Sequence, residues 1–205
     1  MAKFKEKVLA LAEARTQYLK KVTPIDRVIK VLFLGLLPKN LRPNQITVFR
    51  FASIPFIVLL LLTGHILSGA ILFLFSAFSD ALDGALARTS GRVTRWGILA
   101  DPLADKLLVG SAALILVSKY ISLPLAFAIV LIEAFTVVLA YFRYKGRAVP
   151  AKTPAKIKMV LQCFGIIFLL FYALFGGAFM LLLSTWTLYL AVVFALLSLL
   201  LYRSV

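Results

Sequence analysis

The sequence predicts an all-α integral membrane protein with six transmembrane helices, and three observations support this prediction. Of the 205 residues, 62% are hydrophobic, and the mean hydropathy is +1.01. The apolar residues form several runs of about 20 residues, the length that crosses a hydrocarbon layer about 30 Å thick. Lysine and arginine concentrate in alternate connections between those runs, as the positive-inside rule requires of cytoplasmic loops.

The expected spans have bounds near 45–63, 67–88, 97–117, 122–142, 155–176 and 180–201. Basic residues lie before the first span, after the second and after the fourth, and residues 1–44 alone hold ten of them. The opposite connections, at 64–67, 118–122 and 176–177, carry one charge, that of Lys119. This alternation predicts an even number of spans with both termini in the cytoplasm. It also explains the net charge of +15 without a nucleic-acid partner.

The first 44 residues are expected to form a separate cytoplasmic segment ahead of a six-span domain at 45–205. Within it, Thr23 and Pro24 have the order of an N-cap and a first helical residue. The apolar run that follows contains Lys30 and is too short to span a membrane. The pattern predicts an amphipathic juxtamembrane helix whose basic side chains lie against anionic headgroups. A partly ordered tail is the alternative.

Half of the eight acidic residues lie within a short stretch of the second and third predicted spans. Asp80 and Asp83 fall near the cytoplasmic end of the second span, and Asp101 and Asp105 are one turn apart in the third. Each helix can therefore present two carboxylates to a shared space. One carboxylate inside a membrane costs about 2.5–3.5 kcal/mol and indicates function by default, although a neighbouring helix could satisfy it.

Four converging carboxylates repel one another unless cations neutralise them, and a ligand set of oxygen atoms favours Mg²⁺ or a similar hard ion. Metals held in this way clamp phosphate oxygens and offset the charge on a leaving oxygen. The residues therefore favour phosphate chemistry at the membrane surface. A transporter or cation channel is the alternative. It is disfavoured because the aspartates lie toward one face and no charged residues continue a path through the spans.

The same stretch resembles the signature of the CDP-alcohol phosphotransferase family at every fixed position and spacing. These positions are Asp80, Asp83, Gly84, Ala87, Arg88, Gly97, Asp101 and Asp105. Members transfer a phosphoalcohol, often phosphatidyl from CDP-diacylglycerol, to a second alcohol and release CMP. The resemblance therefore implies this reaction, a requirement for two Mg²⁺ or Mn²⁺ ions, and a homodimer in the membrane. A member that serves as a scaffold without catalysis is an alternative that the intact signature argues against.

The resemblance also implies a role for each matching residue. Asp80, Asp83 and Asp101 would bind the metal ions. Asp105 would complete the metal site and accept the proton of the acceptor hydroxyl. The cytidine diphosphate group would be bound by Gly84, Ala87, Arg88, Gly97, Asn44 and Thr47.

Residues outside the signature are expected to select the acceptor alcohol. PNQITVFR places Asn44, Thr47 and Arg50 at three-residue steps and resembles the opening of the phosphatidylglycerol-phosphate synthase branch of the family. A basic cluster follows the fourth span, and a phosphorylated acceptor such as glycerol 3-phosphate would need cations beside the metals. The acceptor-binding residues expected from these features are Arg50, Glu133, Arg143, Lys152 and Lys156.

Departures from that branch leave the acceptor open. AKIKMVLQ (155–162) resembles its GKxKTxxQ motif, with Ala155 and Met159 at two of the fixed positions. Ile132 stands where the branch has the arginine of an Arg-Glu pair, so Glu133 is expected to pair across helices or to be protonated. The long N-terminal segment is more like that of inositol-phosphate members. Glycerol 3-phosphate is the favoured acceptor, and inositol phosphate or another alcohol is the alternative.

Overall fold

The computed structural model describes residues 43–90, 95–144 and 153–203, which form helices and the turns between them. The helices are α3 (Pro43–Leu62), α4 (Ile66–Ser90), α5 (Arg95–Tyr120), α6 (Leu123–Tyr144), α7 (Thr153–Phe175) and α8 (Ala178–Arg203). Each matches one of the expected apolar segments, with its ends within a few residues of the predicted bounds. The predicted juxtamembrane helix lies outside the described residues, and the division into 1–44 and 45–205 stays a prediction.

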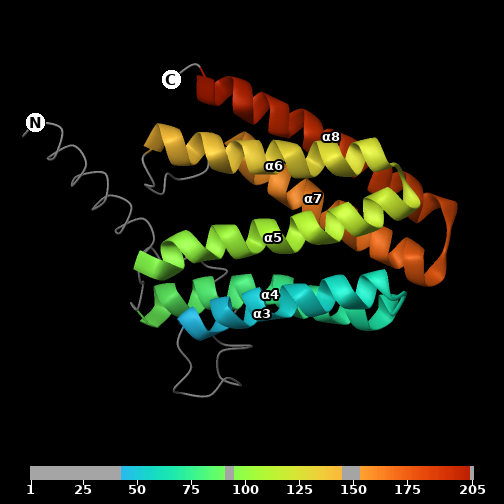
Figure 1. The fold of residues 1–205 in the computed structure, drawn as a ribbon, viewed down its shortest axis with the longest axis horizontal. Coiled ribbons are helices and arrows are strands. Elements are labelled where there is room, and N and C mark those ends of the chain that lie inside the picture. Colours follow the sequence, from blue (N-terminus) through green and yellow to red (C-terminus); the bar gives the residue numbers. More distant parts are fainter. Residues whose placement is uncertain (1–42, 91–94, 145–152, 204–205) are drawn as a thin grey trace, which may run out of the picture.

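Short turns join the helices at one end of the bundle, so that consecutive helices run in opposite directions (Figure 1). These turns are residues 63–65, 121–122 and 176–177. Gly64, Gly176 and Gly177 have φ values of 83°, 73° and 95°, a backbone conformation that glycine adopts without steric cost. The chain can therefore reverse direction within two or three residues at these turns.

The apolar core lies in the half of the bundle next to these turns. In Figure 1, α5 runs through the middle of the molecule, and it packs against α3, α4, α6 and α7, while α7 packs against α8. The core includes Ile57 of α3, Leu116 of α5 and Leu188 of α8, each 0% exposed. Ala112 and Ala113 of α5 are also fully buried, and such small residues allow helices in membranes to approach closely.

Large apolar side chains cover the outside of the described helices. Phe56, Phe75, Leu131, Phe175 and Trp186 are each more than 60% exposed. Soluble monomers rarely expose contiguous apolar surface beyond a few hundred Å². All six described helices carry exposed large apolar side chains, which indicates contact with lipid.

Three of the described helices carry apolar stretches long enough to cross a membrane. They are Asn44–Leu62, Ala155–Phe175 and Ala178–Leu200. The apolar stretches of α4 and α6 are shorter, Ile66–Asp80 and Leu123–Leu139. The structure thus supports an all-helical integral membrane protein, and the crossing of the membrane by all six helices stays a prediction.

Candidate active site

The end of the bundle opposite the turns holds most of the buried polar side chains of the described helices. In α3 and α4 these side chains are Thr47, Arg50, Ser53, Ser76, Ser79 and Asp83. In α6 and α7 they are Glu133, Lys158 and Gln162. Their gathering at one end, away from the apolar core, marks this region as the candidate site.

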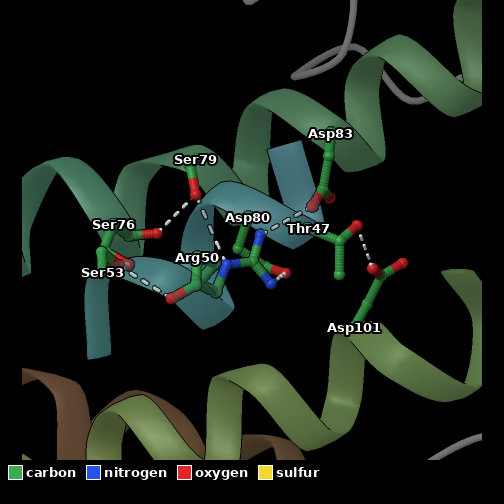
Figure 2. Close-up of polar contacts among 8 residues, drawn as sticks. All are labelled: Thr47, Arg50, Ser53, Ser76, Ser79, Asp80, Asp83 and Asp101. Carbon is green, nitrogen blue, oxygen red and sulfur yellow. Dashed lines mark hydrogen bonds and ion pairs between the residues drawn. The ribbon is translucent and has the colours of Figure 1, made fainter. Parts of the chain in front are cut away.

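Arg50 of α3 is fully buried and joins α3 to α4 through two carboxylates. Its Nη1 donates a hydrogen bond of 2.8 Å to Oδ1 of Asp80, and its Nη2 donates one of 2.7 Å to Oδ2 of Asp83. Its Nε donates a longer bond, 3.4 Å, to Oγ of Ser79. Figure 2 shows the guanidinium group between the two aspartates. One cation therefore offsets part of the charge of two signature carboxylates.

Serines fix the contact between α3 and α4 just beneath this ion pair. The hydroxyl of Ser53 donates to the carbonyl of Arg50 at 2.8 Å and lies 2.8 Å from the hydroxyl of Ser76. The hydroxyl of Ser79 donates to the carbonyl of Ser76 at 2.7 Å. Small side chains at this crossing let the two helices approach closely, which brings Arg50 within reach of α4.

Thr47 lies one turn before Arg50 and joins α3 to α5. Its Oγ1 donates a hydrogen bond of 2.8 Å to Oδ1 of Asp101, as Figure 2 shows. Residues three apart share a face of a helix, so one face of α3 contacts three of the four signature aspartates. The structure therefore brings Asp80, Asp83 and Asp101 together from two helices, with α3 as the common partner.

Asp105 lies one turn further along α5, beside a small cleft between α5, α6 and α7. The residues that line the cleft are Asp105, Lys106, Val109, Gly110, Ile129, Glu133, Met159 and Gln162. Asp105 makes no hydrogen bond with the described residues. It is therefore the signature carboxylate that borders this cleft.

Glu133 of α6 is buried at this cleft and faces lysines from two other helices. Its Oε1 lies 2.6 Å from Nζ of Lys158 on α7, and its Oε2 lies 4.0 Å from Nζ of Lys106 on α5. The structure thus bears out the expectation that Glu133 pairs across helices. Within the described part of the chain, Oε2 accepts no hydrogen bond. Lys106 lines the cleft and Lys158 contacts it through Glu133, so two positive charges lie beside the carboxylates of Glu133 and Asp105.

Comparison with known proteins identifies the family. Residues 40–197 match the family described as CDP-alcohol phosphatidyltransferase. The match covers well over half of the chain and includes both polar clusters. The chain belongs to the CDP-alcohol phosphatidyltransferase family. The predicted family is therefore confirmed, and with it the class of enzyme.

Three relatives share the name CDP-diacylglycerol–glycerol-3-phosphate 3-phosphatidyltransferase. The protein of Rickettsia bellii is 35% identical over 129 residues, which cover 60% of this chain and 71% of the relative. The protein of Bacillus subtilis is 36% identical over 150 residues, which cover 64% and 77%. The protein of Pseudomonas fluorescens is 33% identical over 164 residues, which cover 72% and 84%.

The other predicted nucleotide-binding residues of this phosphatidyltransferase lie at the same end of the bundle. Asn44 is half-buried in the first turn of α3. Three others, Gly84, Ala87 and Arg88, lie in the last turns of α4. Gly97 lies in the first turn of α5. Their roles in binding the cytidine diphosphate group stay predictions.

The predicted acceptor-binding residues fall into three groups. Glu133 lies in the cleft, and Arg50 lies on the other side of α5 with its guanidinium on the aspartates. Lys156 is exposed in the first turns of α7. Arg143 lies near the end of α6, and the structure describes its backbone only. Lys152 lies outside the described residues. The structure leaves the acceptor role of all five a prediction.

Sequence reasoning noted Lys106 beside the aspartates and Lys158 within the basic cluster after the fourth span, but it named neither of them, nor Gln162, as a site residue. Lys106 and Gln162 line the cleft, and Lys158 pairs there with Glu133. Their sequence positions carried a usable signal. Lys106 follows Asp105 directly, so it had to lie near the signature. Lys158 and Gln162 are four residues apart on one helix face within AKIKMVLQ. A polar pair with this spacing in an otherwise apolar helix predicts a polar neighbour on the facing helix.

The chemistry of the aspartates fits a hard divalent cation. All of the donor atoms are carboxylate oxygens, the ligands that Mg²⁺ and Mn²⁺ prefer. Among the described residues, Asp80, Asp83 and Asp101 each accept hydrogen bonds through one oxygen, which leaves the other for a ligand role. In the described residues as they stand, no three acidic or histidine side chains form a group that could hold an ion. The donors therefore fit a metal in kind, and metal binding stays a prediction.

Proposed function

We propose that this family member transfers the phosphatidyl group of CDP-diacylglycerol to glycerol 3-phosphate and releases CMP. The names of the three relatives support this reaction. The observation that carries the choice of acceptor is the cleft beside Asp105, where Glu133 holds lysines from two helices. A phosphorylated alcohol needs such cations close to the carboxylate that receives its proton.

The donor would bind where α4 and α5 approach the connection 91–94. Asp80, Asp83, Asp101 and Asp105 would hold Mg²⁺ or Mn²⁺, two ions by family resemblance, which when bound would stabilise charge on the phosphate oxygens and on departing CMP. Arg88 would contribute positive charge to the pyrophosphate. The glycines and alanine of the signature would leave the helix backbone open to the nucleotide. The acyl chains would then lie along the exposed apolar outside of the bundle.

The acceptor would bind in the cleft between α5, α6 and α7 that Asp105 borders. Lys106 and Lys158 would attract its phosphate, and the ion pair with Glu133 would keep the lysines in place. The acceptor hydroxyl oxygen would form a bond to the phosphorus that carries diacylglycerol, while the bond from that phosphorus to the CMP oxygen breaks. Asp105 would receive the hydroxyl proton as the new bond forms, because a free alcohol is too weak an acid to lose it earlier.

The polar end of the bundle would face the cytoplasm. In the sequence, basic residues precede α3 and follow α4 and α6, the positions that the positive-inside rule assigns to the cytoplasm. Both termini would then be cytoplasmic, and glycerol 3-phosphate, which is water-soluble, would reach the cleft directly. A homodimer is part of the proposal by family resemblance.

A CMP-release assay with a panel of acceptors tests this function. Purified full-length protein in detergent micelles would receive CDP-diacylglycerol, Mg²⁺ and either glycerol 3-phosphate, inositol phosphate, glycerol or serine. We expect CMP only with glycerol 3-phosphate, and phosphatidylglycerol phosphate by mass spectrometry. Absence of CMP with every alcohol would refute the transferase, and CMP with inositol phosphate alone would refute the acceptor. Metal-ion flux in liposomes without CMP would instead support a transporter.

A pair of lysine variants tests the acceptor cleft. Lys158→Met should raise the KM for glycerol 3-phosphate while leaving the KM for CDP-diacylglycerol near that of the wild type. Lys119→Met is the matched control, because this lysine is exposed beside the turn at the opposite end of α5. Equal changes in both KM values for Lys158→Met would show that the cleft does not select the acceptor.

A further inference from the structure

Arg50 is the largest side chain that the fold buries completely among the described residues, and its burial needs an explanation. A buried charge is costly unless hydrogen-bonded partners surround it. Its two carboxylate partners differ in environment, since the Asp83 side chain is 4% exposed and the Asp80 side chain 45%. The guanidinium therefore links a buried carboxylate, Asp83, to a solvent-accessible one, Asp80.

The way in which the guanidinium binds is as informative as its burial. An arginine often grips both oxygens of one carboxylate, with two parallel hydrogen bonds. Here Nη1 and Nη2 bind different aspartates, and each takes one oxygen. Oδ2 of Asp80 and Oδ1 of Asp83 accept no hydrogen bond from the described residues. The hydrogen bonds with Arg50 thus fix the orientation of both carboxylates and leave one oxygen of each for another ligand.

Thr47 likewise binds only one oxygen of Asp101. Its hydroxyl takes Oδ1 of Asp101 at 2.8 Å, and Oδ2 accepts no hydrogen bond from the described residues. Thr47 is 1% exposed, so water does not compete for this bond. Two side chains on one face of α3 therefore orient three carboxylates on two other helices. Groups that hydrogen-bond the ligands of a metal in this manner set the orientation of those ligands.

We propose that Arg50 and Thr47 are positioning residues of the metal site, each fixing signature carboxylates by one oxygen and leaving the other for the ion. This inference rests on the proposed function, because the proposed reaction is what requires the metal. It assigns α3, which contributes none of the signature residues, the task of preparing the carboxylates for metal binding before substrate arrives.

Three possible roles of Arg50 predict different changes in metal affinity when it is replaced, and this makes the proposal testable. If Arg50 only competed with metal for the aspartates, its removal would tighten metal binding, because a positive charge would leave the site. If it only neutralised charge, lysine would replace it without loss. If it positions the carboxylates, lysine keeps the charge but lacks the planar fork that spans both aspartates, and binding weakens. Weaker binding in Arg50→Lys therefore indicates positioning, and unchanged or tighter binding indicates one of the other two cases.

The experiment measures Mn²⁺ binding by electron paramagnetic resonance on the full chain in detergent micelles, without either substrate. We expect Arg50→Lys to weaken binding by about 10–100-fold, the usual effect of losing a group that orients a metal ligand. Thr47→Val should weaken it in the same direction, and Thr47→Ser, which keeps the hydroxyl, should bind like the wild type. Ser53→Ala is the control for loss of a buried hydrogen bond that touches no carboxylate.

Unchanged or tighter Mn²⁺ binding in Arg50→Lys would overturn the proposal. If that variant does not fold, as its melting temperature in EDTA would show, the comparison of Thr47→Val with Thr47→Ser decides, and equal affinities would overturn it. Absence of Mn²⁺ binding by the wild type would remove the metal site altogether. Metal-dependent CMP release by a wild type whose variants bind Mn²⁺ unchanged would overturn this inference and leave the proposed function standing.

Discussion

Replacing Lys158 by methionine should destabilise the protein strongly, because it leaves a buried carboxylate without its nearest cation. The Lys158 and Glu133 side chains are 6% and 11% exposed, and their charged atoms lie 2.6 Å apart. Removing one partner of a buried ion pair typically costs about 3–5 kcal/mol. Lys106 lies 4.0 Å from the other oxygen of Glu133 and is 29% exposed, so it can compensate in part. We therefore expect a loss near the lower end, about 3 kcal/mol.

The assay is equilibrium unfolding in mixed detergent micelles, followed by circular dichroism. It compares Lys158→Met, Glu133→Gln and the double variant that carries both changes. Glu133→Gln combined with Lys158→Met removes both charges and should recover most of the loss, because no unpaired charge remains buried. Lys119→Met is the control. That exposed lysine lies 5.2 Å from the ring centre of Tyr120, a contact worth about 0.5–1 kcal/mol. Equal losses for the two lysine variants, or strictly additive losses in the double variant, would refute the reasoning.

Two further predictions concern catalysis and helix packing. Asp105→Asn should reduce CMP release to background with little change in melting temperature, since Asp105 makes no hydrogen bond with the described residues; a rate near that of the wild type would remove it from the mechanism. Gly165→Ala should cost about 1–3 kcal/mol, because a Cβ there would lie 2.7 Å from the buried side chain of Leu188. Gly110→Ala has no atom within 4 Å of its added Cβ and should be neutral or stabilising by up to about 1 kcal/mol. Equal unfolding midpoints for the two alanine variants would contradict the packing argument.

The helices could be predicted from the sequence because hydrophobic length and turn residues are local signals. An apolar run of about 20 residues admits few structures other than a helix when it lies in lipid. The turn at Gly176 and Gly177 separates two such runs, and both glycines have the positive φ that ends a helix sharply. Helical spacing also placed Asp80 and Asp83 on one face, and the structure joins both to one guanidinium.

The partners of these residues could not be predicted, because they come from other helices whose rotation about their axes is set by packing. Arg50 lies 30 residues before Asp80 and 33 before Asp83, and the sequence indicated only that it begins a span beside the signature. The interpretation of Arg50 as an acceptor ligand rested on resemblance alone. The partner of Glu133 was equally open, since Ile132 removes the local arginine and the lysine that replaces it lies on α7.

The position of α5 explains how one helix can serve two substrates. Asp101 faces α3 through Thr47, on the side where Arg50 holds the α4 aspartates. Asp105 is one turn away and borders the cleft of α6 and α7. Four residues rise about 6 Å along a helix, so the two carboxylates lie close enough to act on one phosphorus atom and its attacking oxygen. Donor and acceptor would then meet at the face of α5 that carries both carboxylates. Substitutions on α3 should therefore alter the affinity for metal, while substitutions on α6 and α7 should alter the affinity for the acceptor.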